Sequence, residues 1–307
     1  MKNKSIIPPP LKTGSIIGII APSGNLSCRN SFEKGIRILH ELGFRTRFPR
    51  SLWPGADYLS DTDTNRLREL RALWNDSEID GIMAARGGYG CLRIVGSLSG
   101  DDFRSSPKRF IGFSDITLLH HTLNCDHGLV TLHGPVVTSL DRLSRKSLLH
   151  FRETLLHPIE NWSFKSDVEI LKGSGTGRGI ATGGNLSTIV STLGTAQQPV
   201  WKNKIVFLED TGESRYRVDR MLTQLKLSGL LDDPAAIVLG DFSHGLGLDE
   251  IGTMRHHESI WNRVLELTAK STAVWANFPM GHADNNMTIP FGLEMIFDNS
   301  RGALFHG

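Results

Sequence analysis

Short apolar runs alternate with segments of helical periodicity through the first half of the chain. Apolar residues recur at helical spacing at Phe32, Ile36 and Leu39, and a further helix is expected to begin at Leu92. Continuous apolar runs of strand length, typical of parallel strands buried on both faces, stand at 15–21, 81–85, 110–113 and 129–133. The alternation predicts βαβ units, and therefore an α/β fold with a parallel sheet and helices on both faces.

The pattern changes after Leu140. Residues 157–178 carry charges and glycines without a clear period, which predicts a crossing between two domains. Beyond it the expected elements are a helix opening at Asn185, strands at 204–209 and 236–240, helices at 215–227 and 259–267, and closing strands at 295–297 and 303–305. We therefore expect an N-terminal α/β domain over 1–157, a linker over 158–178 and a smaller C-terminal α/β domain over 179–307.

Composition narrows the function classes. A length of 307 residues allows two domains with cores of their own, and a net charge of +2 with scattered basic residues gives no indication of a nucleic-acid partner. The three cysteines are few, odd in number and far apart, which argues against a disulfide framework or a cysteine metal site. No apolar segment has the length of a signal peptide core or a membrane span, so a cytoplasmic location is expected.

The segment 109–121, RFIGFSDITLLHH, has the pattern of a strand, a serine at a turn and a helix. A serine at such a turn exposes its hydroxyl beside the first amides of the helix, an arrangement that suits a nucleophile. Ser114 taken alone has a second interpretation, as an ordinary helix N-cap. The segment by itself leaves both interpretations open.

Turns follow four predicted strands, at 22–24, 86–90, 112–115 and 133–135. Because the carboxyl ends of parallel strands meet at one edge of a sheet, these turns are expected to line one site. The RGGYG turn at 86–90 is too short for a dinucleotide fingerprint and lacks the Lys-Ser/Thr pair of a P-loop. Its glycines allow backbone amides to approach a reacting oxygen, although a plain tight turn explains them equally well.

Two further residues complete a candidate catalytic set. Glu209 ends an apolar strand, where an acid is either solvated or orients a histidine, and His282 lies in a turn-rich loop, where a histidine is commonly just exposed. The order Ser114, Glu209, His282 permits acyl transfer, with the histidine as base and the glutamate holding its tautomer. The oxyanion would bind the amide of Asp115 and an amide from Gly87 or Gly88.

Metal chemistry has no support in the sequence. The adjacent histidine pairs at 120–121 and 256–257 diverge on a helix, and no H-E-x-x-H or C-x-x-C motif occurs. No metal or other cofactor is therefore expected. The arginines of 215–220 have two interpretations, as a solvated helix face or as a source of one residue that binds a substrate carboxylate.

The chain resembles the LD-carboxypeptidase family of serine peptidases nearly end to end. The motifs that carry the resemblance are IIAPSG at 19–24, ARGGYG at 85–90, GFSDIT at 112–117, GGNL at 183–186, LEDTGESRYRVDRML at 208–222 and GHADNNMTIPFG at 281–292. One position differs from a common family pattern, since Phe113 replaces the tyrosine often found before the serine.

The resemblance implies a cytoplasmic, homodimeric enzyme of peptidoglycan recycling that removes the terminal D-alanine of a murein tetrapeptide. It implies Ser114 as nucleophile, Glu209 and His282 as its partners, and a site between an α/β N-terminal domain and a smaller C-terminal domain. Arg86, Tyr89, Asn185 and Arg215 are the candidates for contacting substrate.

Two alternatives stay open at this point. A branch of the same family, the microcin C self-immunity peptidases, cleaves an amide between an acidic residue and a nucleotide. Its chains tend to be longer and carry an added aromatic that stacks on the base. Trp162 and Trp201 keep that branch open here. The second alternative is a non-catalytic module that binds a small ligand in the same cleft.

Overall fold

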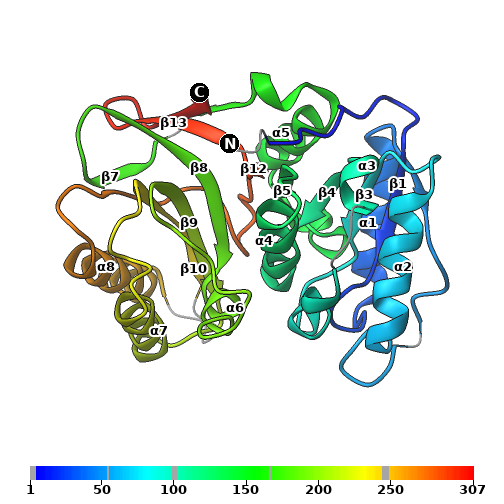
Figure 1. Cartoon of the computed structure of the whole chain (residues 1–307), viewed down its shortest axis with the longest axis horizontal. Helices are drawn as coiled ribbons and strands as arrows, with labels where there is room; N and C mark the ends of the chain where they lie inside the picture. Colours follow the sequence, from blue (N-terminus) through cyan, green and yellow to red (C-terminus); the bar gives the residue numbers. More distant parts are fainter. Residues whose placement is uncertain (1–4, 54, 99–101, 166, 244–248) are drawn as a thin grey trace. The chain divides into compact units, whose positions relative to one another are not determined.

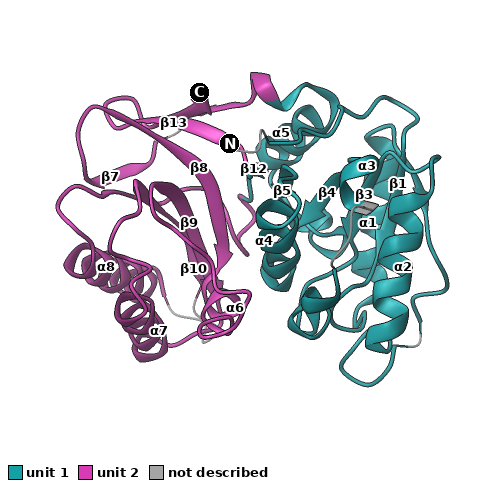
Figure 2. Ribbon diagram, in the orientation of Figure 1, with its two compact units in different colours: residues 1–159, 286–292 teal, residues 160–285, 293–307 magenta. Residues whose placement is uncertain are grey.

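The computed structural model describes residues 5–53, 55–98, 102–165, 167–243 and 249–307. The chain forms two compact units (Figures 1 and 2). Unit 1 contains the chain up to Ile159 together with Asn286–Gly292, and unit 2 contains Glu160–Asn285 and Leu293–Gly307. Among the described residues, no helix is both long enough and apolar enough to cross a membrane.

Unit 1 is built on a six-stranded sheet with the order β12-β5-β4-β3-β1-β2. Its strands are β1 (Ile16–Ile20), β2 (Arg45–Arg47), β3 (Gly81–Ala84), β4 (Arg109–Gly112), β5 (Thr131–His133) and β12 (Ile289–Phe291). The neighbouring pairs from β5 to β2 are parallel, and β12 is antiparallel to β5. The predicted α/β fold with a parallel N-terminal sheet is confirmed.

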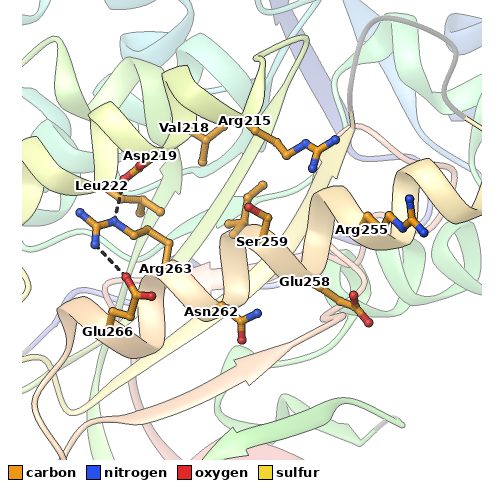
Figure 3. A pocket seen from close by; sticks show the side chains of 11 residues that line it. Arg215, Val218, Asp219, Leu222, Arg255, Glu258, Ser259, Asn262, Arg263 and Glu266 are labelled. Atoms are coloured by element: carbon orange, nitrogen blue, oxygen red, sulfur yellow. Dashed lines mark hydrogen bonds and ion pairs between the residues drawn. The ribbon is translucent and has the colours of Figure 1, made fainter.

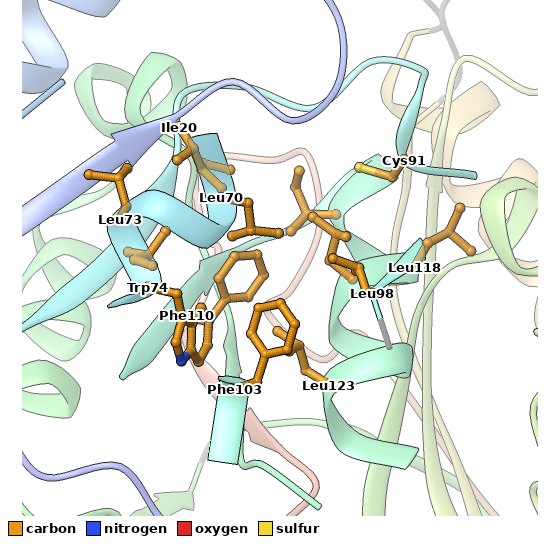
Figure 4. Close-up of a cluster of buried hydrophobic side chains, with 14 of the residues drawn as sticks. Ile20, Leu70, Leu73, Trp74, Cys91, Leu98, Phe103, Phe110, Leu118 and Leu123 are labelled. Atoms are coloured by element: carbon orange, nitrogen blue, oxygen red, sulfur yellow. The ribbon is translucent and has the colours of Figure 1, made fainter. Parts of the chain in front are cut away.

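Helices cover both faces of this sheet. They are α1 (Arg29–Glu41), α2 (Asp63–Asn75), α3 (Asp102–Ser105), α4 (Thr117–Cys125) and α5 (Arg145–Leu156). On one face, Trp74 from α2 and Phe103 from α3 pack edge to face in a buried cluster with Phe110 and Leu123 (Figure 4). On the other face the buried guanidinium of Arg109 donates hydrogen bonds to carbonyl groups near the end of α5.

The helix expected from Leu92 is wrong. Two 3₁₀ turns, Cys91–Arg93 and Val95–Ser97, occupy this stretch instead. Two features oppose a helix here. The amide of Cys91 donates to the carboxylate of Asp115. Gly96 lies within the segment, and glycine is unfavourable in a helix interior. The stretch after β3 therefore forms short 3₁₀ turns instead of an α-helix.

Unit 2 contains an eight-stranded mixed sheet with the order β6-β14-β13-β8-β9-β10-β11-β7. Its strands are β6 (Ser163–Lys165), β7 (Glu169–Lys172), β8 (Thr176–Asn185), β9 (Lys204–Thr211), β10 (Ala236–Ser243), β11 (Ala273–Ala276), β13 (Glu294–Asp298) and β14 (Ala303–His306). Strands β8 to β11 are parallel, and the outer strands are antiparallel to their neighbours.

The helices of unit 2 are α6 (Leu186–Val190), α7 (Arg215–Leu227) and α8 (Glu250–Leu267). They share a core with Leu208 of β9, Leu239 of β10 and Val274 of β11, which all point to one face of the sheet. Helix α8 begins nine residues before the expected 259, with Asp249 as its N-cap. Its first turns are polar, so the apolar period becomes visible only later.

The structure also differs from the expected boundaries between domains. The segment 158–178, expected as a linker, contributes β6, β7 and the start of β8 to the sheet of unit 2. Strand β7 is only half-buried and β8 is rich in glycine, so neither has the apolar signature of a strand. The turn-rich loop after His282 contains β12, which belongs to unit 1.

Candidate functional site

Ser114 lies where β4 ends, in a backbone conformation that a serine rarely adopts. Its φ angle is +64°, and the chain passes through the 3₁₀ turn Ser114–Ile116 directly into α4. The left-handed region costs a residue with a side chain about 1–3 kcal/mol, and such strain is concentrated at functional sites. The predicted elbow is therefore present, and Ser114 is not a helix N-cap, because the N-caps of the 3₁₀ turn and of α4 are Phe113 and Ile116.

A buried histidine supports the elbow from behind. His120 of α4 places Nε2 2.8 Å from the carbonyl oxygen of Gly112 and Nδ1 2.9 Å from Oγ1 of Thr131. Burial lowers the pKa of His120 to about 4, so the ring is neutral and can donate only one of these hydrogen bonds. His120 thus has a structural role behind the elbow.

The RGGYG turn lies against the serine. A Cβ atom added to Gly87 would come within 2.8 Å of Cβ and 2.9 Å of Oγ of Ser114. Only glycine permits this approach, because real Cβ contacts are longer. The amides of Gly87 and Gly88 donate no hydrogen bond to a backbone oxygen among the described residues, so they are available to a bound group.

Unit 2 carries an acid–histidine pair. Nδ1 of His282 lies 2.7 Å from Oε2 of Glu209, whose side chain is fully buried, whereas the side chain of His282 retains 20% of its exposure. Glu209 is near the carboxyl end of β9 and pairs in register with Asn185 at the end of β8. Gly183 allows the two strands this register, because a Cβ there would overlap the carbonyl oxygen of Phe207.

The charges of three carboxylates raise the pKa of His282. Burial lowers the pKa of His282, but the negative charges of Glu209, Asp210 and Asp241 outweigh burial and hold it above the ordinary 6.5. Burial, reinforced by the charge of Glu209, raises the pKa of Asp210 to about 6. Burial also raises the pKa of Asp241. The histidine is therefore a stronger base than a solvated one.

Both halves of the chain match models of known domains. The model described as the LD-carboxypeptidase N-terminal domain matches residues 17–134, and the model of the LD-carboxypeptidase C-terminal domain matches residues 178–296. The first range contains Ser114 and the second contains Glu209 and His282. The chain belongs to the LD-carboxypeptidase family. It is accordingly a hydrolase of the serine peptidase class.

Relatives within the family carry two kinds of name. A "probable murein peptide carboxypeptidase" of Bacillus subtilis is 32% identical, over 95% of this chain and 92% of its own. The structure of a muramoyltetrapeptide carboxypeptidase from Oxalobacter formigenes is 28% identical, with a TM-score of 0.81 over 94% of this chain and 97% of that one. A microcin C7 self-immunity protein in complex with aspartyl sulfamoyl adenosine is 25% identical, with a TM-score of 0.85 over 98% of both chains.

Two substrate-contact candidates lie in the RGGYG turn of this family member. Arg86 is occupied by its own loops, because it donates to the carbonyl oxygens of Asn25 and Gly87 and to Oγ of Ser27. Tyr89 is 51% exposed, and its ring lies 6.0 Å from that of Tyr58. Tyr89 thus offers a face to a ligand, whereas Arg86 holds the turn.

The other two candidates lie in unit 2. Asn185 is buried and caps α6, because its Oδ1 accepts from the amide of Thr188. Arg215 begins α7 and lines a groove of about 560 Å³ between α7 and α8 (Figure 3). In that groove Arg263 is paired with Asp219 and Glu266, whereas Arg215 and Arg255 lie at the other end.

Sequence reasoning did not identify Asp210 and Asp241 as acids that raise the pKa of His282. Asp241 lies within a bulge of β10, between Leu239 and Phe242, and its Oδ1 lies 3.9 Å from Nε2 of His257 on α8. The bulge shifts the alternation of side chains, so the period of the strand does not indicate which face Asp241 occupies. Asp210 was visible beside Glu209, and only its burial distinguishes it from a solvated acid.

Replacing Glu209 by glutamine should lower the pKa of His282. The E209Q variant loses the largest attraction that opposes burial, while burial itself remains. Titration of the His282 ring by NMR measures the change directly. The matched control is E266Q, an exposed acid on α8, which should leave the titration of His282 unchanged. An unchanged pKa in E209Q would contradict the assigned electrostatics.

Proposed function

We propose that the protein is a serine carboxypeptidase that cleaves the L,D-peptide bond before the terminal D-alanine of murein tetrapeptides. The observation that carries this proposal is the left-handed elbow at Ser114 in a chain of the LD-carboxypeptidase family. The names of two relatives, a murein peptide carboxypeptidase and a muramoyltetrapeptide carboxypeptidase, support the substrate class.

The proposed reaction uses a Ser-His-Glu triad. Oγ of Ser114 attacks the carbonyl carbon, and Nε2 of His282 takes its proton while Nδ1 stays bonded to Glu209. The imidazolium then gives this proton to the nitrogen of the leaving D-alanine, and an acyl-enzyme is left. Water, deprotonated by His282, hydrolyses the ester and restores the serine.

The proposed oxyanion site consists of backbone amides near Ser114. The amides of Asp115 and of Gly87 or Gly88 would bind the negative oxygen of the tetrahedral intermediate, and each such donor is worth about 3–4 kcal/mol in known enzymes. The proximity of Gly87 to Ser114 supports this assignment.

The mechanism requires His282 of unit 2 to reach Ser114 of unit 1 in the active protein. Chain connectivity favours this, because the loop that carries His282 runs directly into β12, a strand of the sheet that carries Ser114. We propose a cytoplasmic, homodimeric enzyme of peptidoglycan recycling, in keeping with the resemblance described above.

A second candidate is cleavage of an amide between an acidic residue and a nucleotide, as in the microcin C branch. The likeness to the self-immunity protein favours it. The two tryptophans that kept this branch open do not, because Trp162 is 6% exposed and Trp201 is 1% exposed, and neither offers a face to a base. The murein substrate is therefore the first choice.

Incubation with the L,D-tetrapeptide should release alanine, and its all-L counterpart should release none. Ser114→Ala should abolish release, because the nucleophile is lost. Liquid chromatography with mass detection measures the products. Release of the free acidic residue and the amine-bearing nucleotide from an acidic aminoacyl-nucleotide amide, with no alanine from the tetrapeptide, would select the microcin branch. No release from any substrate would favour a binding module.

The rate should rise with pH through the neutral range. His282 must be neutral to accept a proton, and its raised pKa places the ascending limb of kcat/KM above the 6.5 of an ordinary histidine. Steady-state kinetics on the tetrapeptide from pH 5 to 9 give this profile. A flat profile would count against His282 as the base.

Replacing Gly87 by alanine should cut kcat at least about 100-fold, the loss expected when one oxyanion donor is displaced. The new methyl group would collide with Ser114, so either the serine or the turn must move. Gly96→Ala is the matched control, because a Cβ there meets nothing within 4 Å. Equal activities of the two variants would contradict the proposed role of the turn.

A further inference from the structure

A buried carboxylate joins three loops behind the elbow. Asp115 is 4% exposed, and its Oδ2 accepts hydrogen bonds from Oγ of Ser23 and, at 2.9 Å, from the amide of Cys91. Ser23 follows β1, Cys91 follows the RGGYG turn after β3, and Asp115 follows β4. These strands are neighbours in the sheet, so one side chain links three adjacent strand ends.

A buried arginine holds two of the same loops from the side of α2. The guanidinium of Arg66, which is 1% exposed, donates through Nη1 to the carbonyl oxygens of Pro22 and Gly90, the latter at 3.0 Å. Its Nη2 lies 2.6 Å from Asp63. Pro22 and Gly90 directly precede Ser23 and Cys91. Each loop is therefore fixed at two consecutive residues.

These ties determine where the RGGYG turn lies. The amide of Gly24 donates to the carbonyl oxygen of Gly87 at 3.4 Å, and Gly87 lies so near Ser114 that a Cβ on it would collide with the serine. Asp115 is thus connected to both ends of the RGGYG turn. One connection runs through Ser23 and Gly24 to Gly87. The other runs through Cys91, the residue after the turn. A shift of either loop would move the RGGYG turn relative to Ser114.

Stability alone is a weak reason for this network. Burying a carboxylate has a desolvation cost that hydrogen bonds only partly offset, and apolar residues often stabilise such a position as well. What apolar residues do not supply is a fixed position for polar backbone groups. Preorganised amides are what an oxyanion site requires, because donors that must reorganise during the reaction lose most of their effect.

We propose that Asp115 is a positioning residue whose carboxylate, acting with Ser23, holds the amides of the RGGYG turn in place beside Ser114. This inference rests on the proposed serine mechanism. It assigns to the side chain of Asp115 a role separate from that of its backbone amide.

A control residue, Asp80, lies at the opposite end of the strands, where β1 and β3 begin. Asp80 accepts a hydrogen bond from the amide of Ile16 at 2.8 Å and likewise ties two neighbouring strands, but at the start of β1 and β3. Removing either carboxylate costs a main-chain hydrogen bond. Only the removal of Asp115 should affect the reactivity of Ser114.

The test measures phosphonylation of Ser114 by a fluorophosphonate, with mass spectrometry to identify the site, alongside kcat and KM on the tetrapeptide. We expect D115A to lower the labelling rate and kcat about 100-fold with KM within about threefold, and D80A to leave both rates within about threefold. D115N should restore most of the loss, because its amide oxygen can accept both hydrogen bonds. S23A, which removes one tie, should lower both rates about fivefold.

Several outcomes separate this inference from the proposed function. Labelling of D115A at the wild-type rate would overturn the positioning role and leave the serine mechanism standing. If D115A fails to fold, S23A decides: a wild-type labelling rate in S23A overturns the inference. Labelling of the wild type without tetrapeptide hydrolysis rejects the substrate, while the labelling rates still support or reject the role of Asp115. Absence of any labelling at Ser114 overturns both proposals.

Discussion

The left-handed backbone of Ser114, the proposed nucleophile, is the constraint on which the unit 1 part of the candidate site depends. A residue with a side chain stays in this region only when its surroundings hold it there. The carbonyl of Gly112 is bonded by His120, the turn at Gly87 lies against the serine, and Asp115 is fixed by two donors on separate loops. The sheet of unit 1 thus provides a rigid edge at which the strain is retained.

The contribution of unit 2 to the candidate site is electrostatic, because its carboxylates raise the pKa of His282. A histidine buried as deeply as His282 would ordinarily lose basicity, and the surrounding carboxylates reverse that tendency. The carboxylates in turn oppose one another, which contributes to the raised pKa of Asp210. The strand ends of β9 and β10 therefore concentrate negative charge where a protonated imidazole would form. This arrangement favours protonation of the His282 imidazole.

The central strands of both sheets could be predicted because burial on two faces requires continuous apolar runs, as at β1, β3 and β9. Three edge strands, β6, β7 and β12, escaped prediction, because an edge strand needs fewer apolar residues. Strand β12 contains Pro290, which an edge position tolerates and which marks a turn in the sequence. The positions of Ser114, Glu209 and His282 at turns and strand ends were also accessible, because chemistry at such places has local signatures. The roles of Asp115, Arg66 and Asp241 were not, because they depend on contacts between loops far apart in the chain.

The residues that carry the proposed chemistry are those that break local rules of folding. A serine has a positive φ, a glycine stands where a side chain would collide, and carboxylates are buried near one another. Each departure is unfavourable in isolation, and each is surrounded by well-packed, regular structure that tolerates it. The buried clusters around Trp74 and Leu208 therefore contribute to function indirectly. They supply the rigidity without which the strained serine would relax and the acids would become solvated.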